Sequence, residues 1–277
     1  MHGPLPLFAF LAVLYAPTVV LNSSLWGQAD SLYTAALVAC LYFLLKKREP
    51  LAFALLGVAF AFKLQALFLT PLLILLCLRG MVSWKNFLLV PIVYLVTILP
   101  TWLAGRRLID LLTIYVAQGT TYRQLSEHAP NMYTWFPNDY YDLLFPAGIV
   151  WAGIVVFLFI VVAFKSPATI TSPLVVEIAT LSALIVPYCL PKMHERYFFP
   201  ADVLSIIFAF FFPRYALVAV AIGMTSFFAY LPFLFEHEVI PLPLLALALL
   251  SVISVMAQHL IRLLWSTGSQ RSYDGVS

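Results

Sequence analysis

Long apolar runs, separated by short polar segments, repeat along nearly the whole chain. An α-helix needs about 17–25 apolar residues to cross a bilayer, and several runs reach that length. The runs predict helices over residues 5–21, 30–46, 51–62, 66–79, 86–104, 146–164, 170–190, 197–212, 214–233 and 240–264. We therefore predict an all-α protein, a polytopic transmembrane helix bundle of about ten spans, in which residues 1–265 form a single domain.

The apolar run over residues 51–79 is interrupted by Lys63 and Gln65. A single helix of this length would measure about 43 Å at about 1.5 Å per residue, whereas the hydrocarbon core of a bilayer is about 30 Å thick. We therefore predict two short helices that meet at Lys63. One strongly tilted helix is the alternative.

Composition supports the membrane assignment, since 63% of the residues are hydrophobic and only 10% are charged. The formal charge of +3 is small and scattered, which argues against a nucleic-acid partner. The three cysteines, Cys40, Cys77 and Cys189, lie in or at the ends of apolar runs and are interpreted as buried thiols. Neither they nor the histidines have metal-ligand spacing, so we expect no metal site and no cofactor.

The short basic loops alternate onto one face of the predicted bundle, and the positive-inside rule makes that face cytoplasmic. These loops are at residues 46–48, 79–85, 165, 214 and the basic C-terminal end. The opposite face receives residues 22–30, 63–65, 105–145, 192–196 and 236–238. The prediction is a multi-pass protein of a bacterial plasma membrane, or of the endoplasmic reticulum membrane in a eukaryote.

Residues 105–145 form the one long polar insertion, predicted to be extracytoplasmic. It opens with Arg106 and Arg107, which begin a short amphipathic stretch that could lie along the membrane surface. Further on, Asn131 and Trp135 stand among many aromatic, amide and acidic residues. That mixture is typical of surfaces that bind carbohydrate and also of interfacial aromatic belts, and both interpretations stay open. The tail over residues 266–277 is predicted to be disordered.

Polar residues also gather at two earlier boundaries of the predicted face. Gln28 and Asp30 follow Trp26, a combination that suits a sugar but also an interfacial belt with a helix N-cap. An ionisable residue at the bilayer centre costs about 2.5–3.5 kcal/mol. Lys63 is accordingly either an anchor that snorkels to the surface or a cation that faces an internal site with Gln65.

The densest charged segment is Pro191–Asp202, between two apolar runs. In helical geometry Lys192, Glu195 and Arg196 would share one face. His194 could transfer a proton or donate to an oxyanion, and Lys192 and Arg196 could clamp a phosphate. Basic residues on this face run against the positive-inside trend, and an anionic ligand would explain them. The alternative is an exposed turn whose charges pair with one another and with lipid headgroups.

Four stretches occur in an order that resembles one family: "NSSLWGQADSLYTAAL", "AFAFKLQALFLTPLLILL", "EHAPNMYTWF" and "KMHERYFFPADVL". They are similar to the GT-C glycosyltransferases, closest to bacterial relatives of the GPI mannosyltransferases and to the glucosyltransferases of lipid-linked oligosaccharide assembly. The resemblance implies an extracytoplasmic cavity in a helix bundle. There a hexosyl group, such as mannosyl, would pass with inversion from a polyprenyl-phosphate sugar donor to a glycan or lipid acceptor, within membrane lipids.

The resemblance also implies roles for residues of this chain. Lys63, His194 and Arg196 would stabilise the phosphate leaving group, with help from Arg106 or Arg107. In the family the catalytic base lies in a first loop after a first transmembrane helix, ahead of the region matched here. We therefore expect an N-terminally incomplete sequence without that helix and loop, and Asp30 is the candidate for the base. A transporter or flippase of a lipid-linked substrate and a non-catalytic membrane subunit are the alternatives.

Overall fold

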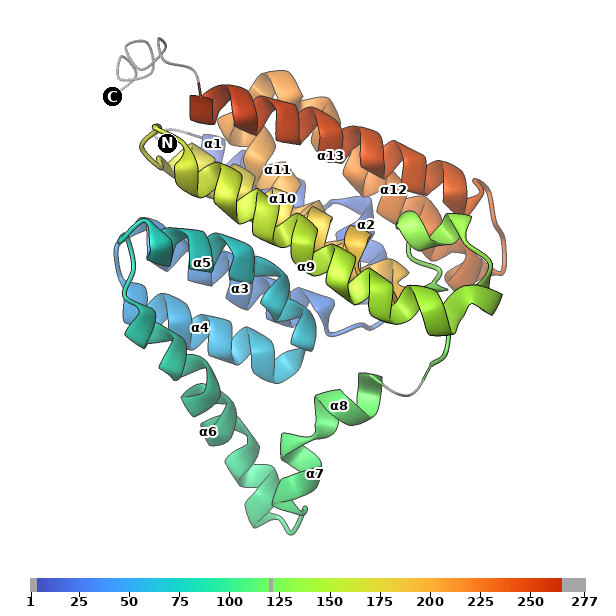
Figure 1. The fold of residues 1–277 in the computed structure, drawn as a ribbon, viewed down its shortest axis with the longest axis horizontal. Helices are drawn as coiled ribbons and strands as arrows, with labels where there is room; N and C mark the ends of the chain where they lie inside the picture. The colour runs from blue at the N-terminus through green and yellow to red at the C-terminus, as the bar shows by residue number, and fades with distance from the viewer. Residues whose placement is uncertain (1–3, 120–121, 266–277) are drawn as a thin grey trace.

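Helices make up most of the computed structural model, which describes residues 4–119 and 122–265 (Figure 1). The first half contains α1 (Leu5–Leu14), α2 (Pro17–Val20), a π-helical turn (Leu21–Leu25), α3 (Asp30–Leu45), α4 (Glu49–Phe62), a 3-10 helix (Leu64–Leu69), α5 (Thr70–Leu78), a 3-10 turn (Trp84–Leu88), α6 (Leu89–Leu103), α7 (Leu108–Leu112) and α8 (Ile114–Gly119). The second half contains β1 (Ser126–Glu127), 3-10 turns at Met132–Trp135 and Asn138–Tyr140, α9 (Tyr141–Lys165), α10 (Ser172–Cys189), β2 (Met193–His194), a 3-10 turn (Glu195–Phe198), α11 (Phe199–Phe211), a 3-10 turn (Pro213–Tyr215), α12 (Ala216–Phe235) and α13 (Leu242–Trp265).

The break at Lys63 is confirmed. Helix α4 ends at Phe62, and the backbone of Lys63 is extended, with φ −152° and ψ 139°. The chain then resumes as the 3-10 helix, and α5 follows with Pro71 in its first turn, where the missing N–H of proline costs nothing. The single tilted helix is therefore the wrong alternative.

The predicted helix over residues 5–21 is wrong as a continuous element. Two segments, Leu5–Leu14 and Pro17–Leu25, meet at an angle of 49°. The cause is Pro17, because the residue before a proline is driven out of the α region, and Ala16 has ψ 131°.

The predicted count of ten spans is not confirmed by the lengths of the helices. Within residues 4–119 and 122–265, five helices are long and apolar enough to cross a membrane, or six if the bent N-terminal pair is one span. They are Trp84–Leu103, Asn138–Lys165, Ser172–Cys189, Pro213–Phe235 and Leu242–Trp265. Three further apolar helices, Asp30–Leu45, Glu49–Phe62 and Leu64–Leu78, are shorter. The all-α prediction is confirmed at this coarser level, and the count of ten spans is not.

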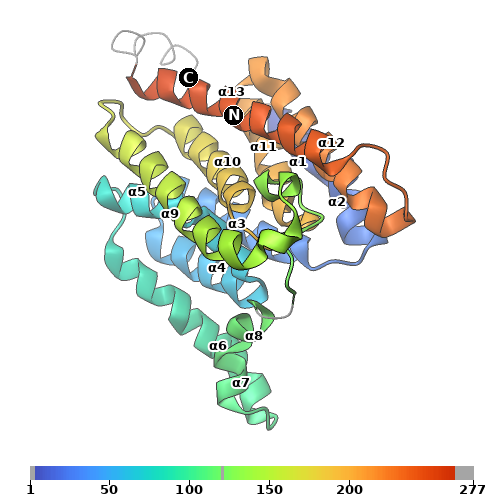
Figure 2. The ribbon, with the colours of Figure 1, turned by 45° about the vertical axis from the view of Figure 1, so that its right-hand side comes forward.

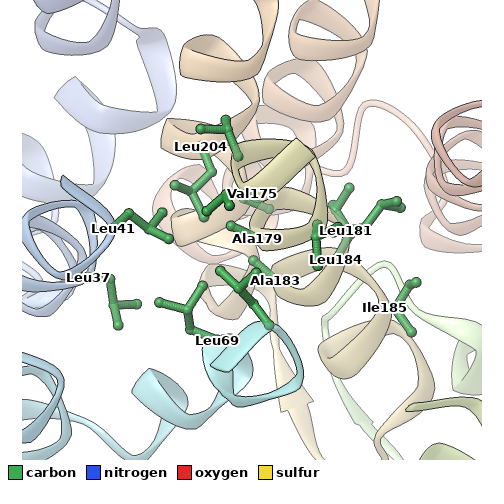
Figure 3. Close-up of a cluster of buried hydrophobic side chains, with 14 of the residues drawn as sticks. Leu37, Leu41, Leu69, Val175, Ala179, Leu181, Ala183, Leu184, Ile185 and Leu204 are labelled. Atoms are coloured by element: carbon green, nitrogen blue, oxygen red, sulfur yellow. The ribbon is translucent and has the colours of Figure 1, made fainter. Parts of the chain in front are cut away.

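Helix α10 lies at the centre of the bundle, with nearly all of its residues buried. Its small residues, including Ala179 and Ala183, let leucines of α3, α11 and the segment after Lys63 pack closely against it (Figure 3). Such close packing fixes the position of both ends of α10. The charged segment that follows Cys189 therefore starts from a rigid support.

The turns of the bundle gather at two ends, as the alternation of the loops predicts. At one end a cavity of about 350 Å³ is lined by residues of three turns, among them Lys47, Val82 and Thr171. Arg79 ties the same end together by donating to the hydroxyl of Ser166 and the carbonyl of Ala168, at 3.1 and 2.7 Å. The other end carries the candidate site.

Helix α6 packs against α4, and its far end forms with α7 and α8 an arm that extends away from the rest of the bundle (Figures 1 and 2). The amphipathic stretch predicted after Arg106 is helical, as α7 and α8. The hydroxyl of Tyr94 donates to the carbonyl of Leu111 at 2.6 Å and so fastens α7 to α6. The predicted disorder of residues 266–277 lies outside the described residues.

Candidate functional site

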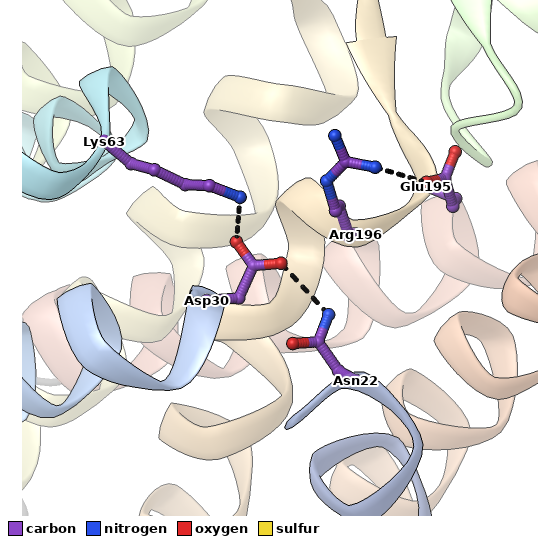
Figure 4. A network of polar contacts seen from close by, with 5 residues as sticks. All are labelled: Asn22, Asp30, Lys63, Glu195 and Arg196. Atoms are coloured by element: carbon purple, nitrogen blue, oxygen red, sulfur yellow. Dashed lines mark hydrogen bonds and ion pairs between the residues drawn. The ribbon is translucent and has the colours of Figure 1, made fainter. Parts of the chain in front are cut away.

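Asp30 is the centre of a buried polar cluster, and its side chain has no exposed surface. Asn22 donates from Nδ2 to one carboxylate oxygen at 3.0 Å, and Lys63 forms an ion pair with the other oxygen (Figure 4). The three residues come from the π-helical turn, the start of α3 and the break between α4 and the next 3-10 helix. The break therefore releases Lys63 from a helix and lets its ammonium reach Asp30.

Arg196 brings a second cation to the same place from the turn before α11. Its Nη1 lies 3.3 Å from a carboxylate oxygen of Glu195, and its guanidinium carbon lies 5.5 Å from the centre of the Trp26 ring. Figure 4 shows Arg196 and Lys63 on either side of Asp30, and their positive charges repel each other. The cluster therefore holds two cations within electrostatic range of each other.

Aromatic rings surround both cations. The ring of Tyr197 lies 5.9 Å from Nζ of Lys63 and 6.0 Å from the guanidinium carbon of Arg196. The ring of Tyr33 lies 5.8 Å from Nζ of Lys63, and the side chain of Gln65 hydrogen-bonds Tyr197. These rings cover part of each cation, and the reduced contact with water strengthens any charge interaction that the cations make.

The cations keep unused hydrogen-bonding capacity. Side-chain exposure is 19% for Lys63 and 22% for Arg196, so both remain reachable from outside the cluster. Nε of Arg196 is buried and has no hydrogen-bond partner among the described residues. Buried donors are normally paired, and an unpaired one is therefore a position where a ligand acceptor would be stabilising.

A short main-chain pairing places His194 beside the cluster. Strand β1 pairs in parallel with β2, with Ser126 opposite Met193 and Glu127 opposite His194. His128 has a left-handed backbone with φ 62° and forms a further bridge with His194. The loop before α9 is thus joined to the segment between α10 and α11.

His194 is a neutral imidazole at neutral pH. Burial, together with the nearby charges of Arg196 and Lys63, lowers the pKa of His194 from 6.5 to about 4. Its ring packs edge-on against Tyr197, at 5.1 Å between centroids. His194 can consequently donate or accept a hydrogen bond, but it contributes no positive charge of its own.

The face predicted for Lys192, Glu195 and Arg196 does not form. Lys192 has φ 62° and lies outside any helix, because its N–H is used to pair with the carbonyl of Leu125 at 2.8 Å. Its ammonium donates to the carbonyl of Gly119 at 2.5 Å. Lys192 therefore holds the loop, while Arg196 belongs to the cluster.

The structure places the remaining predicted residues as follows. Gln28 is half-buried, close in sequence to the cluster, and its N–H donates to the carbonyl of Asn22 at 3.0 Å. Asn131 is fully buried and donates to the carbonyl of Leu190 at 3.1 Å, which is a structural role. Trp135 is 42% exposed.

Arg106 and Arg107 are exposed on the arm and are not brought to the cluster. Arg107 pairs with Asp110 at 2.7 Å. The phosphate role implied for these two arginines is therefore not supported by their position.

Three residues of the cluster were not singled out as site residues from the sequence: Asn22, Tyr33 and Tyr197. Tyr33 lies one helical turn after Asp30, so the spacing of three could have indicated it. Tyr197 carries no comparable signal, because its partners Lys63 and Gln65 are distant in sequence. Asn22 lies only eight residues before its partner Asp30, but in a π-helical turn outside α3, so no helical spacing relates the two. Within residues 4–119 and 122–265, no three His, Cys, Asp or Glu side chains are placed to hold a metal ion.

No family model, curated protein or solved structure matches this chain.

Proposed function

We propose that this chain is a membrane-embedded glycosyltransferase, which transfers a hexosyl group from a polyprenyl-phosphate donor to an acceptor hydroxyl on the extracytoplasmic side. The observation that carries the proposal is the pair of cations, Lys63 and Arg196, which meet at one end of the bundle. Each cation already has one carboxylate partner, Asp30 or Glu195, but Nε of Arg196 has no partner among the described residues and an ammonium has three donors. A phosphate that accepts from both would use these donors and would reduce the repulsion between the two cations. The resemblance to GT-C enzymes supplies the sugar chemistry.

In this reaction the acceptor oxygen forms a bond to the anomeric carbon as the bond from that carbon to the phosphate oxygen breaks. The hydroxyl proton passes to solvent water at the partly exposed end of the cluster, and polyprenyl phosphate leaves with additional negative charge. Lys63 and Arg196 stabilise that charge, and the neutral His194 can donate a hydrogen bond to it. Groups already fixed by the fold do this without reorganising during the reaction.

Asp30 fits the role of a counterion better than that of the base. Both of its oxygens are engaged, one by Lys63 and one by Asn22, and the side chain is fully buried. A carboxylate whose two oxygens both already accept from donors has no uncontacted oxygen for an acceptor proton. We therefore assign to Asp30 the positioning of Lys63.

The long apolar helices support a membrane setting, which agrees with a lipid-linked donor. The prenyl chain would lie in the bilayer next to the bundle, with the phosphate at the helix ends. The plasma membrane of a bacterium, with a glycan or lipid acceptor, is the location that we propose.

The test is sugar transfer by the whole chain, purified and reconstituted in lipid nanodiscs, from radiolabelled polyprenyl-phosphate mannose or glucose to a lipid extract of the host membrane. We expect Arg196→Ala to lower the rate about 10²–10³-fold, the loss seen when one charge-stabilising donor is removed. Lys63→Arg should retain partial activity, because a planar guanidinium meets phosphate differently from an ammonium. Arg262→Ala is the control, since Arg262 is exposed on α13 near the opposite end.

Full activity in Arg196→Ala, with the protein monodisperse, would refute the phosphate role. Movement of the intact lipid-linked sugar across the bilayer without transfer would instead support the transporter alternative.

A further inference from the structure

A second cavity, of about 300 Å³, lies between the loop before α9 and the turn before α13. Such a volume is at the lower end for small-molecule sites and suits a ligand of one or two sugar rings. The described residues that line it are Gln124, Leu125, Ser126, His128, Tyr133, Thr134, Phe136, Asn138, Glu238, Leu242 and Pro243. It is separate from the Asp30 cluster, because the two share no residue.

The lining favours a neutral ligand with many hydroxyl groups. No lysine or arginine is among the described residues that line it, so it offers no full positive charge for a phosphate. The side chains of Gln124 and His128 make no hydrogen bond with any residue that the structure describes, and Phe136 presents an exposed ring, at 44% exposure. Amide and imidazole groups beside an aromatic face are the usual means of binding a sugar, whose ring has hydroxyl edges and an apolar face.

His128 connects this cavity to the cation cluster. It lines the cavity and bridges to His194 through the main chain. Its side chain also interacts electrostatically with His194 and Glu195. The part of a ligand that contacts His128 would therefore lie close to His194 and Glu195, beside the cation cluster that is proposed to bind the donor phosphate.

The wall of the cavity is fixed before any ligand arrives. The hydroxyl of Tyr133 donates to the carbonyl of Cys189 at 3.0 Å, at the end of the central helix α10. Asn138 accepts from the N–H of Leu125 at 2.8 Å and donates to the carbonyl of Arg123 at 3.0 Å, which closes the loop on itself. A preformed site loses less entropy on binding than a mobile loop.

We infer that this cavity binds the acceptor, and that the acceptor is a carbohydrate. The inference rests on the proposed function for the reaction that follows, in which an acceptor hydroxyl directed past His128 would attack the anomeric carbon of the donor. Binding itself requires no donor and no transfer. The two proposals can consequently be tested apart.

The experiment is equilibrium binding of methyl hexosides and hexose disaccharides to the whole chain in nanodiscs without donor, measured by isothermal titration calorimetry. We expect binding to weaken about tenfold in Gln124→Ala and in His128→Gly, the effect of losing one hydrogen bond of ordinary strength. Glycine accepts the left-handed backbone of residue 128, so this variant removes the imidazole and leaves the loop unstrained. Asp139→Ala is the matched control, since Asp139 is exposed in the same loop but does not line the cavity.

The inference is overturned if none of these sugars binds at millimolar concentration, or if both cavity variants bind as well as the wild type. Arg196→Ala should bind the sugars normally while it loses transfer. If the wild type binds sugars through Gln124 and His128 but transfers none, the proposed function fails and the carbohydrate site stands.

Discussion

Asp30 is held by donors from two distant segments, so each of the three side chains depends on the others. A buried ion pair contributes little net stability when it is complete, because desolvation of the charges opposes their attraction. Breaking the pair is costly, because the remaining charge is left without compensation in a site that water does not reach. The pair of Lys63 and Asp30 is therefore a strong test of how this end of the bundle is organised.

We expect Lys63→Met to destabilise the protein by about 3–5 kcal/mol, because the carboxylate of Asp30 stays buried without its cation. The double variant Lys63→Met with Asp30→Asn should recover much of that loss. The measurement is the midpoint of thermal aggregation in detergent, with the exposed Lys85→Met as the control. If the double variant is no more stable than Lys63→Met, the ion pair is not what links the two segments.

The low pKa of His194 makes a specific contribution to the pH dependence of stability. Between about pH 6.5, the ordinary value for histidine, and about pH 4, the unfolded chain binds a proton that the folded chain does not. The stabilising contribution of His194 to the free energy of unfolding is complete above about pH 6.5. It is lost as the pH falls from about 6.5 to about 4. We expect the wild type to lose thermal stability relative to His194→Gln when the pH is lowered from 7 to 5, measured for both in the same detergent.

A constant difference between the two proteins over this range would show that His194 is not buried beside the cations. Other titratable groups, such as Glu195, are common to both proteins, and their own contributions cancel in the comparison.

At the level of single residues, the sequence showed which charged side chains matter, but it did not show which residues they contact. Lys63 and Arg196 could be singled out because a charge between apolar runs is unusual, and the structure brings both to one cluster. Asn131 was predicted to bind substrate but is buried against α10, since its burial depends on how the loop docks. No local pattern carries that information.

Among the elements, α9 and the loop before it meet at Gly148. A Cβ added at Gly148 would lie 2.1 Å from the hydroxyl oxygen of Tyr133, so only glycine fits beneath that ring. Tyr133 in turn hydrogen-bonds the end of α10. This contact therefore locks α9, the loop and α10 together.

We expect Gly148→Ala to destabilise the protein by about 1–3 kcal/mol, the range for overpacking a close contact, and to loosen the loop. Gly153→Ala on the same helix is the matched control, because nothing lies within 4 Å of its added Cβ and alanine is the better helix former. The readouts are thermal stability and the rate of limited proteolysis between residues 122 and 138. Equal behaviour of the two variants would contradict the proposed packing.

Helix positions were predictable because long apolar runs and prolines mark them directly. Every predicted helix overlaps an observed one, and the break at Lys63 could be derived from length alone. The bend at Pro17 was missed, although the proline that causes it is visible in the sequence, because the run around it is continuously apolar.

For the molecule as a whole, the turns at the two ends of the bundle are predicted to lie on opposite sides of the membrane, and cysteine labelling can test this topology. We expect cysteines introduced at Gln28 and Asp139 to react with a membrane-impermeant maleimide in intact cells, and cysteines at Arg48 and Lys165 to react only after permeabilisation. The physical reason is that the first pair lies at the end with the candidate site and the second pair at the basic end. Labelling of Arg48→Cys and Asp139→Cys from the same side would contradict this arrangement.

The span count could not be read from hydropathy, because an apolar helix may contact lipid or protein. Helix α10 is apolar and of spanning length, yet 83% of it is buried inside the bundle. Helices α3 and α4 are equally apolar and shorter than a span. Composition is similar in all three, so hydropathy alone gives neither the shorter length of α3 and α4 nor the burial of α10.

The pairing of β1 with β2 has a consequence for how such a protein can diversify. Main-chain hydrogen bonds join the loop that lines the second cavity to the segment that carries the cation cluster, and they do not depend on which side chains the paired residues carry. Substitutions at cavity positions such as Gln124 can therefore accumulate without shifting the loop relative to Arg196. If the proposed transferase function holds, recognition of new acceptors and retention of the transfer chemistry can evolve as separate traits.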